Sequence, residues 1–331
     1  MPSILRRIVP DKFVLALLTT VALASFFPAK GTALDAIGAI STAAIVTLFF
    51  LHGVKIAPQA VVDGFRRWKL QLAIFVFGYV FVPALGFGAS LLAHGVLGSG
   101  LALGLIYLAV LPTTVQSSIV YVSIARGNVA AAVIASAVSN IAGVVLAPLL
   151  IGLLASTHGA LLGFNGIGFD GIGRIMLILL LPFALGQVAR RWLAPWAARN
   201  KALVFYLDRG TIVIAVYVAF SEAVNGGLWG RVTAAQLSLL FAVVLAMLAI
   251  AFASAWGLGR LLGFDAEDRA TMLFSGAHKS LATGAPMARI LFPGPEAGAI
   301  LLPLMLYHQL QLMASAIVAA RMAKRADPQP D

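Results

Sequence analysis

The segment MLFSGAHKSLATGAPMARILFPG, residues 272–294, decides how this 331-residue chain folds. Its two ends are apolar, whereas its centre carries His278, Lys279, Ser280 and Thr283 among glycines and a proline. An ammonium group at mid-membrane costs between about 2.5 and 17 kcal/mol unless something compensates it. The pattern therefore predicts a membrane helix that is interrupted at a polar site, because unwound backbone at that depth must line a cavity or be buried in protein.

The composition of the whole chain agrees with a membrane protein. Hydrophobic residues make up 61% and charged residues 11%, which is more apolar surface than one soluble core can bury. The net charge of +11 lies in short clusters between apolar runs, as in loops that face an anionic leaflet, so we expect a lipid bilayer and not nucleic acid as partner. The absence of cysteine excludes disulfides and thiolate metal sites.

Ten apolar stretches are candidates for membrane spans. They cover residues 13–28, 36–54, 70–93, 99–124, 129–154, 172–192, 203–224, 234–262, 270–291 and 297–320. The first follows Arg6 and Arg7 as a signal peptide would, but further spans follow at once, so we expect it to be retained. The prediction is a single all-α membrane domain over residues 1–331.

The distribution of basic residues predicts the orientation of these spans. With the N-terminus inside, 18 of the 23 Lys and Arg residues fall on the inner side. Four fall outside, namely Lys30, Arg174, Arg231 and Arg289, and Lys279 lies within span nine. By the positive-inside rule both termini are cytoplasmic, with a short tail at 321–331, and we expect the plasma (inner) membrane as location.

The chain divides into two halves of five spans, about 13–154 and 172–320. An odd number of spans per half inverts the second half, as in many secondary transporters. Span four, with LAVLPTTVQSSIVYVSIARGN at 108–128, and span nine are both apolar with a polar centre that holds proline or glycine. Two such breaks could offer helix N-terminal amides to an anion and free carbonyls to a cation. The alternative is that small and polar residues only kink the helices and let them pack.

Candidate substrate- or ion-binding residues lie on spans four, five and nine. Ser136, Ser139 and Asn140 share one helical face of span five, where interhelical hydrogen bonding is an equal alternative. The remaining candidates are Thr113, Thr114, Gln116, Ser117, Ser118, Ser275, His278, Lys279, Ser280 and Thr283. We expect a structural role for His52, Tyr307, His308, Gln309 and Gln311.

Lys279 is the most informative of these residues. It could be neutral because burial disfavours the charged form. It could be held by carbonyls at a half-helix C-terminus, where a metal cation would otherwise sit, or it could pair with an anionic substrate. Snorkelling to an interface is a fourth alternative. The nearest intramembrane acid is Glu222, towards the outer end of span seven.

Two motifs resemble a known family. SSIVYVSIARGNVA at 117–130 and GAHKSLATGAP at 276–286 resemble the bile acid:sodium symporter family, in the branch that contains its seventh human member. The resemblance implies a panel of spans 1, 2, 6 and 7 and a core of spans 3–5 and 8–10, with the broken spans four and nine crossing. It also implies alternating access, with an organic anion bound between panel and core.

The resemblance implies a sodium site that this chain keeps only in part. Ser118 and Ser136 match sodium-ligating hydroxyls of the well-studied members. Other ligand positions hold different residues, namely Gly78, Ile119, Ala132, Phe274 and His278. Sodium is therefore one candidate coupling ion, and the alternative is a proton-coupled transporter or uniporter in which Lys279 replaces sodium.

We predict a secondary active transporter of a small organic anion, not an enzyme, with no cofactor apart from sodium as a candidate coupling ion. An enzyme built on Ser275 and His278, or on Lys279 as a Schiff-base nucleophile, lacks an activating partner in the sequence. A channel or regulatory membrane protein is the other rival. Substrate, transport direction and oligomeric state are left open.

Overall fold

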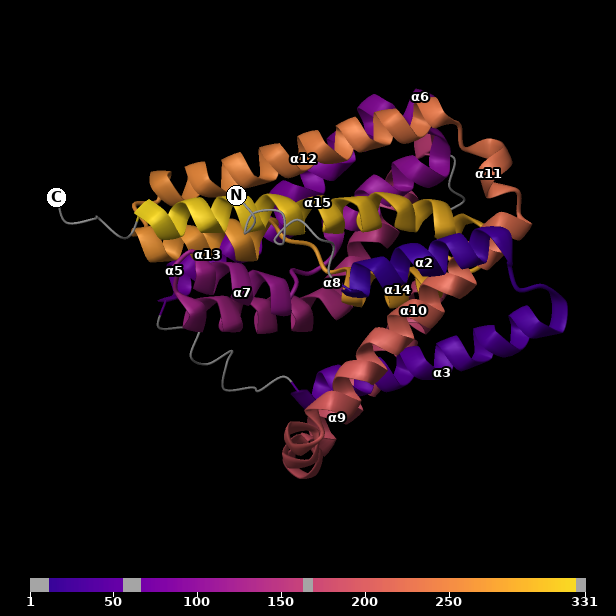
Figure 1. Cartoon of the computed structure of the whole chain (residues 1–331), viewed down its shortest axis with the longest axis horizontal. Coiled ribbons are helices and arrows are strands. Elements are labelled where there is room, and N and C mark those ends of the chain that lie inside the picture. Colours follow the sequence, from indigo (N-terminus) through magenta and orange to yellow (C-terminus); the bar gives the residue numbers. More distant parts are fainter. Residues whose placement is uncertain (1–11, 56–66, 163–168, 326–331) are drawn as a thin grey trace.

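The computed structural model describes residues 12–55, 67–162 and 169–325, which form helices and no strand (Figure 1). Arg6, Arg7 and Arg66 of the charge count, residues 163–168 of the expected joining loop and the tail from residue 326 lie outside the described residues. The elements are α2 (Lys12–Phe26), α3 (Gly31–Lys55), α5 (Trp68–Val76), η2 (Phe77–Phe81), α6 (Val82–Val110), α7 (Gln116–Ile124), α8 (Val129–Leu162), α9 (Phe169–Arg199), α10 (Lys201–Asn225), α11 (Leu228–Arg231), α12 (Ala234–Leu261), α13 (Ala266–Ala277), α14 (Leu281–Leu291) and α15 (Glu296–Arg325).

Seven helical segments of the described chain are long and apolar enough to cross a membrane. They are Gly31–Lys55, Trp68–Val110, Val129–Leu154, Leu177–Arg199, Lys201–Asn225, Ala234–Leu261 and Glu296–Lys324. The expected count of ten differs for three reasons. The first expected span is the short helix α2, the third and part of the fourth run together as Trp68–Val110, and the ninth is divided into α13 and α14.

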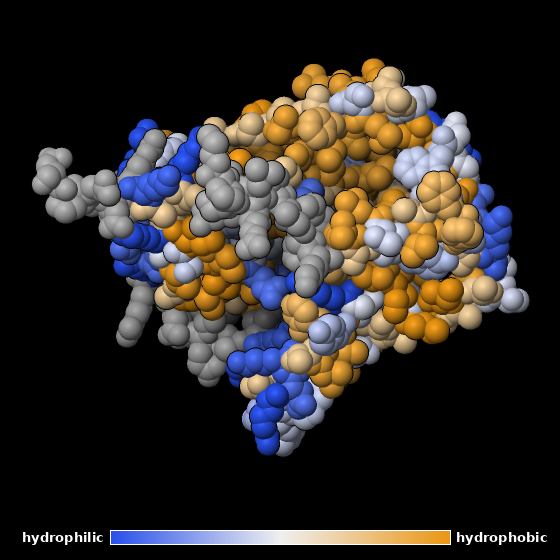
Figure 2. Space-filling model, viewed as in Figure 1, coloured by the Kyte–Doolittle hydropathy of each residue, from blue (hydrophilic) through white to orange (hydrophobic). Residues whose placement is uncertain are grey.

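The surface of the molecule is mostly apolar, as expected of a protein in a lipid bilayer. Leu237, Phe241 and Leu245 of α12 are exposed although they are large and apolar, and so are Leu92 and Leu185 elsewhere. Figure 2 shows apolar residues over most of the body, with hydrophilic residues gathered at its two ends and at the tip near α9. A soluble monomer rarely exposes so much contiguous apolar surface. The chain is a multi-pass integral membrane protein.

Helix α10 packs against α2 and α3, and α3 packs against α9, on one side of the molecule (Figure 1). The contact between α3 and α9 is the most extensive of any helix pair described. It centres on Gly53, which lies against the backbone of Phe183, and on Gly186, which lies against the backbone of Phe50. Small residues at a crossing let two membrane helices approach to backbone contact.

The interior is centred on the second half of α6. Every residue from Leu101 to Thr114 is buried. Gly104 lets α6 approach the backbone of Ile300 and the ring of Pro303 on α15. The C-terminal end of α6 is thereby surrounded by protein, where an interrupted backbone does not meet lipid.

Three interruptions divide the helical segments. Gly98 has φ 75°, a conformation that favours glycine, and divides Trp68–Val110 into two parts. The chain is non-helical from Leu111 to Val115, between α6 and α7. It is non-helical again from His278 to Ser280, between α13 and α14. The last two interruptions fall where the sequence predicted breaks in spans four and nine.

Candidate functional site

The two breaks meet inside the protein. The backbone N–H of Ser280 donates a hydrogen bond of 2.9 Å to the carbonyl oxygen of Pro112. Ser280 also begins α14, since its hydroxyl accepts a hydrogen bond from the N–H of Thr283 and so caps the helix. The start of α14 therefore lies beside the end of α6.

Lys279 is held by backbone carbonyls. Its side chain is 1% exposed, and its Nζ donates hydrogen bonds of 2.9 Å each to the carbonyl oxygens of Gly78 and Leu111. Leu111 is the residue that ends α6, so Nζ sits at the negative end of that helix dipole. Among the alternatives that the sequence left open, this is the carbonyl arrangement.

The carbonyl of Gly78 is free for Lys279 because of a local irregularity. Residues Phe77–Phe81 form a π turn in which the N–H of Val82 bonds to the carbonyl of Phe77. The same i to i+5 pattern would pair Gly78 with Pro83, but proline has no N–H. The π turn and the proline together leave an oxygen unpaired within the helix, and Lys279 supplies the donor.

A glutamine from α15 fixes the backbone of Lys279. The Lys279 N–H donates to Gln311 Oε1 at 2.9 Å, and Gln311 Nε2 donates to the Lys279 carbonyl at 3.0 Å. Gln311 is fully buried. The ring centroid of Tyr79 lies 5.9 Å from Nζ, within reach of a cation–π interaction. Within the described part of the chain Lys279 makes no ion pair, and Glu222 pairs instead with Arg289 at 2.9 Å.

His278 joins the two breaks through hydroxyl groups. Its Nδ1 lies 3.3 Å from Thr114 Oγ1 and 3.5 Å from Ser117 Oγ, and its Nε2 lies 2.7 Å from Ser315 Oγ on α15. The hydroxyl oxygens Thr114 Oγ1 and Ser117 Oγ are 2.5 Å apart. Because His278 is fully buried, these contacts fix the orientation of its ring.

A second group of oxygens gathers where α7 meets α8. Ser118 Oγ donates to the carbonyl of Thr114 at 2.5 Å and lies 3.1 Å from Ser136 Oγ. Ser136 Oγ also lies 3.4 Å from the same carbonyl. These neutral oxygens are of the kind that hard cations prefer. The structure therefore brings together the two hydroxyls that the resemblance assigns to sodium, without a carboxylate among these hydrogen-bonded partners.

The span-five residues also reach both breaks. Asn140 Nδ2 donates to the carbonyl of Thr113 at 3.1 Å, and Asn140 Oδ1 accepts from Thr283 Oγ1 at 3.2 Å. Ser139 Oγ accepts from the N–H of Thr113 at 3.0 Å, and its carbonyl accepts from Tyr79 at 2.6 Å. The first non-helical segment and the first turn of α14 are thus hydrogen-bonded to α8 by buried side chains.

Two candidates behave differently from the rest. Gln116, the first residue of α7, is exposed. Ser275 Oγ is buried without a hydrogen-bond partner, and His278 makes its bonds to other residues. Ser275 and His278 therefore do not form a hydrogen-bonded dyad in this conformation.

A small cavity lies beside Lys279. It is lined by residues of both breaks and by Tyr79, Ser139 and Ser275. Its volume of about 10 Å³ is that of a single water molecule. A molecule larger than water does not fit there in this conformation.

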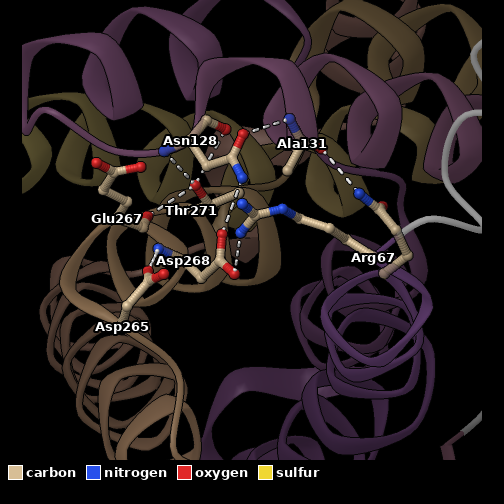
Figure 3. A network of polar contacts seen from close by, with 8 residues as sticks. Arg67, Asn128, Ala131, Asp265, Glu267, Asp268 and Thr271 are labelled. Carbon is tan, nitrogen blue, oxygen red and sulfur yellow. Dashed lines mark hydrogen bonds and ion pairs between the residues drawn. The ribbon is translucent and has the colours of Figure 1, made fainter.

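A separate polar network ties the far ends of the two broken segments together (Figure 3). Asp268 accepts from Arg67 Nη1 at 2.7 Å and from Asn128 Nδ2 at 2.9 Å. Thr271 Oγ1 accepts from the N–H of Asn128 at 3.0 Å. The start of α13 is in this way fixed to the turn between α7 and α8.

Sequence reasoning did not predict several partners of the cluster. The residue types Gly78 and Leu111 do not indicate that their backbone carbonyls bind Lys279, and Tyr79 lies in an apolar run with no sign of a polar role. Gln311 was expected to be structural and Ser315 was not singled out, although both lie at helical spacing on α15, which could have indicated a polar stripe facing span nine.

Long apolar helices with two interrupted segments meeting at a buried lysine are typical of membrane transporters. The model of the SBF-like CPA transporter family matches residues 11–324, and the chain belongs to this family. An uncharacterized protein of Pseudomonas aeruginosa is 44% identical over 97% of this chain and 95% of its own length. The Escherichia coli protein named "Putative symporter YfeH" is 42% identical, over 96% and 94%. Sodium/bile acid cotransporter 7 of Xenopus tropicalis is 25% identical, over 96% and 92%.

Proposed function

We propose that this protein is a secondary active transporter that carries a small organic anion across the membrane by alternating access. We propose further that the ammonium of Lys279 takes the place of a coupling sodium ion. Transport is then driven by protons or runs as uniport.

The observation that carries the proposal is the pair of carbonyl contacts made by Lys279. A buried ammonium on the oxygens of Gly78 and Leu111 uses the same ligands that would bind a metal cation. Gly78 is also the position at which the resemblance expects a sodium-ligating glutamine. A covalently attached cation supplies the positive charge permanently, without depending on the sodium concentration.

The substrate class follows from the helix ends around the site. The N-termini of α7 and α14 both begin at the crossing, and each carries a partial positive charge. Together with Lys279 they favour an anionic group. The hydroxyls of Thr114, Ser117 and Thr283 are donors for its oxygens. The names of the sodium/bile acid cotransporter 7 relatives are consistent with an organic anion.

The proposed architecture has ten spans in two inverted repeats. A segment of 43 residues such as Trp68–Val110 would be about 65 Å long, roughly twice the hydrocarbon thickness, and the kink at Gly98 supplies the division. With α2 counted and α13 joined to α14, the described helices add up to ten spans. The panel would comprise α2, α3, α9 and α10, and the core the remaining spans. Both termini would be cytoplasmic, in the plasma (inner) membrane.

Sodium symport is the second candidate. It is favoured by the names of the Escherichia coli and Xenopus tropicalis relatives, and by the oxygens at Ser118 and Ser136. Against it, these hydroxyls already make hydrogen bonds within the protein, and their hydrogen-bond partners among the described residues include no carboxylate. Hard cations in proteins are usually bound with carboxylate help.

An enzyme or a channel is less well supported. Ser275 and His278 do not hydrogen-bond to each other, and the relatives that carry functional names are named as transporters. A Schiff-base lysine must reach an aldehyde or ketone substrate. Lys279 is instead buried, with its Nζ on backbone carbonyl oxygens. A channel would show an ion current that does not saturate with substrate concentration, whereas transport by a carrier saturates.

The experiment is uptake into liposomes that contain the purified protein. Labelled taurocholate and labelled short monocarboxylates serve as probes, under an imposed sodium gradient, an imposed proton gradient or neither. We expect saturable uptake of an anion that does not require sodium. Uptake driven only by the sodium gradient would overturn the role given to Lys279.

Lys279→Met is the matching variant, because methionine keeps the length and apolar packing of the side chain but loses the ammonium. We expect it to fold and to lose coupled uptake. Lys69→Met, at an exposed lysine, is the control and should transport normally. Unchanged transport in Lys279→Met would contradict the proposal.

A further inference from the structure

An ion pair joins the proposed panel to the proposed core. Glu222 of α10 contacts Arg289 of α14, with 2.9 Å between Oε1 and Nη2, and both side chains are about 15% exposed. Glu222 Oε2 also accepts a hydrogen bond of 3.2 Å from the N–H of Gly294. By contrast, the pair of Lys55 with Asp208 joins two panel helices.

Close packing surrounds the pair on both sides. A Cβ atom at Gly226, which follows α10, would lie 2.5 Å from Cβ of Pro295, and one at Gly298 would lie 2.5 Å from Cβ of Ala223. On α3, Gly38 leaves room for the Arg289 guanidinium, with Nη2 3.4 Å from the place of a Cβ. The end of α10 is therefore seated on the α14–α15 connection.

The same face of α14 is open nearer the breaks. Residues 282 and 289 are seven apart and share a helical face, about 10 Å from each other along the axis. Ala282 is exposed, whereas Leu281 and every residue from Thr283 to Ala288 are buried. This face of α14 is thus covered by the panel at Arg289 and accessible at Ala282, two turns closer to the breaks.

We propose that the pair of Glu222 with Arg289 is a latch that closes the outer side of the transport crevice, and that it must open when the protein faces outward. This inference rests on the alternating-access mechanism proposed above. Opening separates α10 from α14 and gives Ala282 access to the outer solution. Removal of one partner favours opening, because the other charge is then left partly buried without compensation.

Thiol labelling tests the latch, since the chain has no cysteine of its own. Ala282→Cys is combined with Glu222→Gln, and a membrane-impermeant maleimide is applied to right-side-out and to inside-out vesicles. We expect Ala282→Cys alone to react mainly from the inner side. Glu222→Gln should raise its rate of labelling from the outer side about tenfold, equivalent to about 1.4 kcal/mol.

Two further variants serve as controls. Asp208→Asn breaks the pair within the panel and should leave outer labelling unchanged. The double exchange Glu222→Arg with Arg289→Glu should restore slow outer labelling. Suppose that Ala282→Cys is labelled from the inner side but that Glu222→Gln does not change its labelling from the outer side. This result would overturn the latch and leave the transport proposal standing. Failure of Ala282→Cys to react from either side in every variant would overturn both.

Discussion

Gly186→Ala tests the helix pair on which the proposed panel is built. A Cβ atom at Gly186 would overlap the carbonyl oxygen of Phe50 and lie 2.9 Å from its carbonyl carbon. Ordinary contact begins at about 3.4 Å, so the carbon contact alone requires α3 and α9 to separate by about 0.5 Å, and the oxygen contact requires more. Neither obstacle can rotate away, because both atoms belong to the backbone of α3.

The cost can be estimated from this separation. A gap of about 0.5–1 Å forfeits between a quarter and a half of the dispersion energy at each contact along the pair. Overpacked interiors lose typically about 1–3 kcal/mol for an added methyl-sized group. Because the obstacle here is backbone and the pair is the most extensive in the described chain, we expect a loss near 3 kcal/mol.

The assay is reversible denaturation in mixed detergent micelles, followed by helical content. Gly257→Ala on α12 is the control, since a Cβ there meets nothing within 4 Å, and the higher helix propensity of alanine should leave stability unchanged or raise it by up to about 1 kcal/mol. If Gly186→Ala were as stable as Gly257→Ala, α3 and α9 would not cross in backbone contact.

Two further substitutions probe the site by the same assay. Ser280→Ala removes the cap of α14 and should cost about 0.5–2 kcal/mol; Ser280→Asn should retain most of the stability, and equal loss in both would point away from capping. Gln311→Leu leaves the N–H and the carbonyl of Lys279 without buried partners and should cost about 2–5 kcal/mol from two unmet groups; a loss below about 0.5 kcal/mol would show that Gln311 does not hold this backbone.

The positions of the two breaks could be predicted from the sequence. Pro112 cannot continue α6, and a lysine within an apolar run needs polar partners. Both segments therefore predict a polar interior. The pairing of corresponding segments predicted that the two breaks meet, and the structure places the hydroxyls of Thr114 and Ser117 beside His278. The family membership was predicted from short motifs in the same segments.

The partners of Lys279 could not be predicted, because backbone carbonyls leave no trace in residue type. The oxygen of Gly78 is available only because a π turn coincides with Pro83, and nothing in a sequence fixes a π turn. Gln116 is exposed, and its place among the substrate-binding candidates stays a prediction. Which residues of α7 face the cluster could not be predicted, because in a helix of nine residues the start determines the phase, and a shift of one residue turns a side chain by about 100°.

The most direct test of the central proposal is the thermal stability of the purified protein in sodium, potassium and choline chloride at equal ionic strength. If Lys279 occupies the place of the cation, the three salts give the same melting temperature. A saturable rise that is specific to sodium would contradict the account. At sodium concentrations ten times the dissociation constant, such binding would stabilise the protein by about 1.4 kcal/mol.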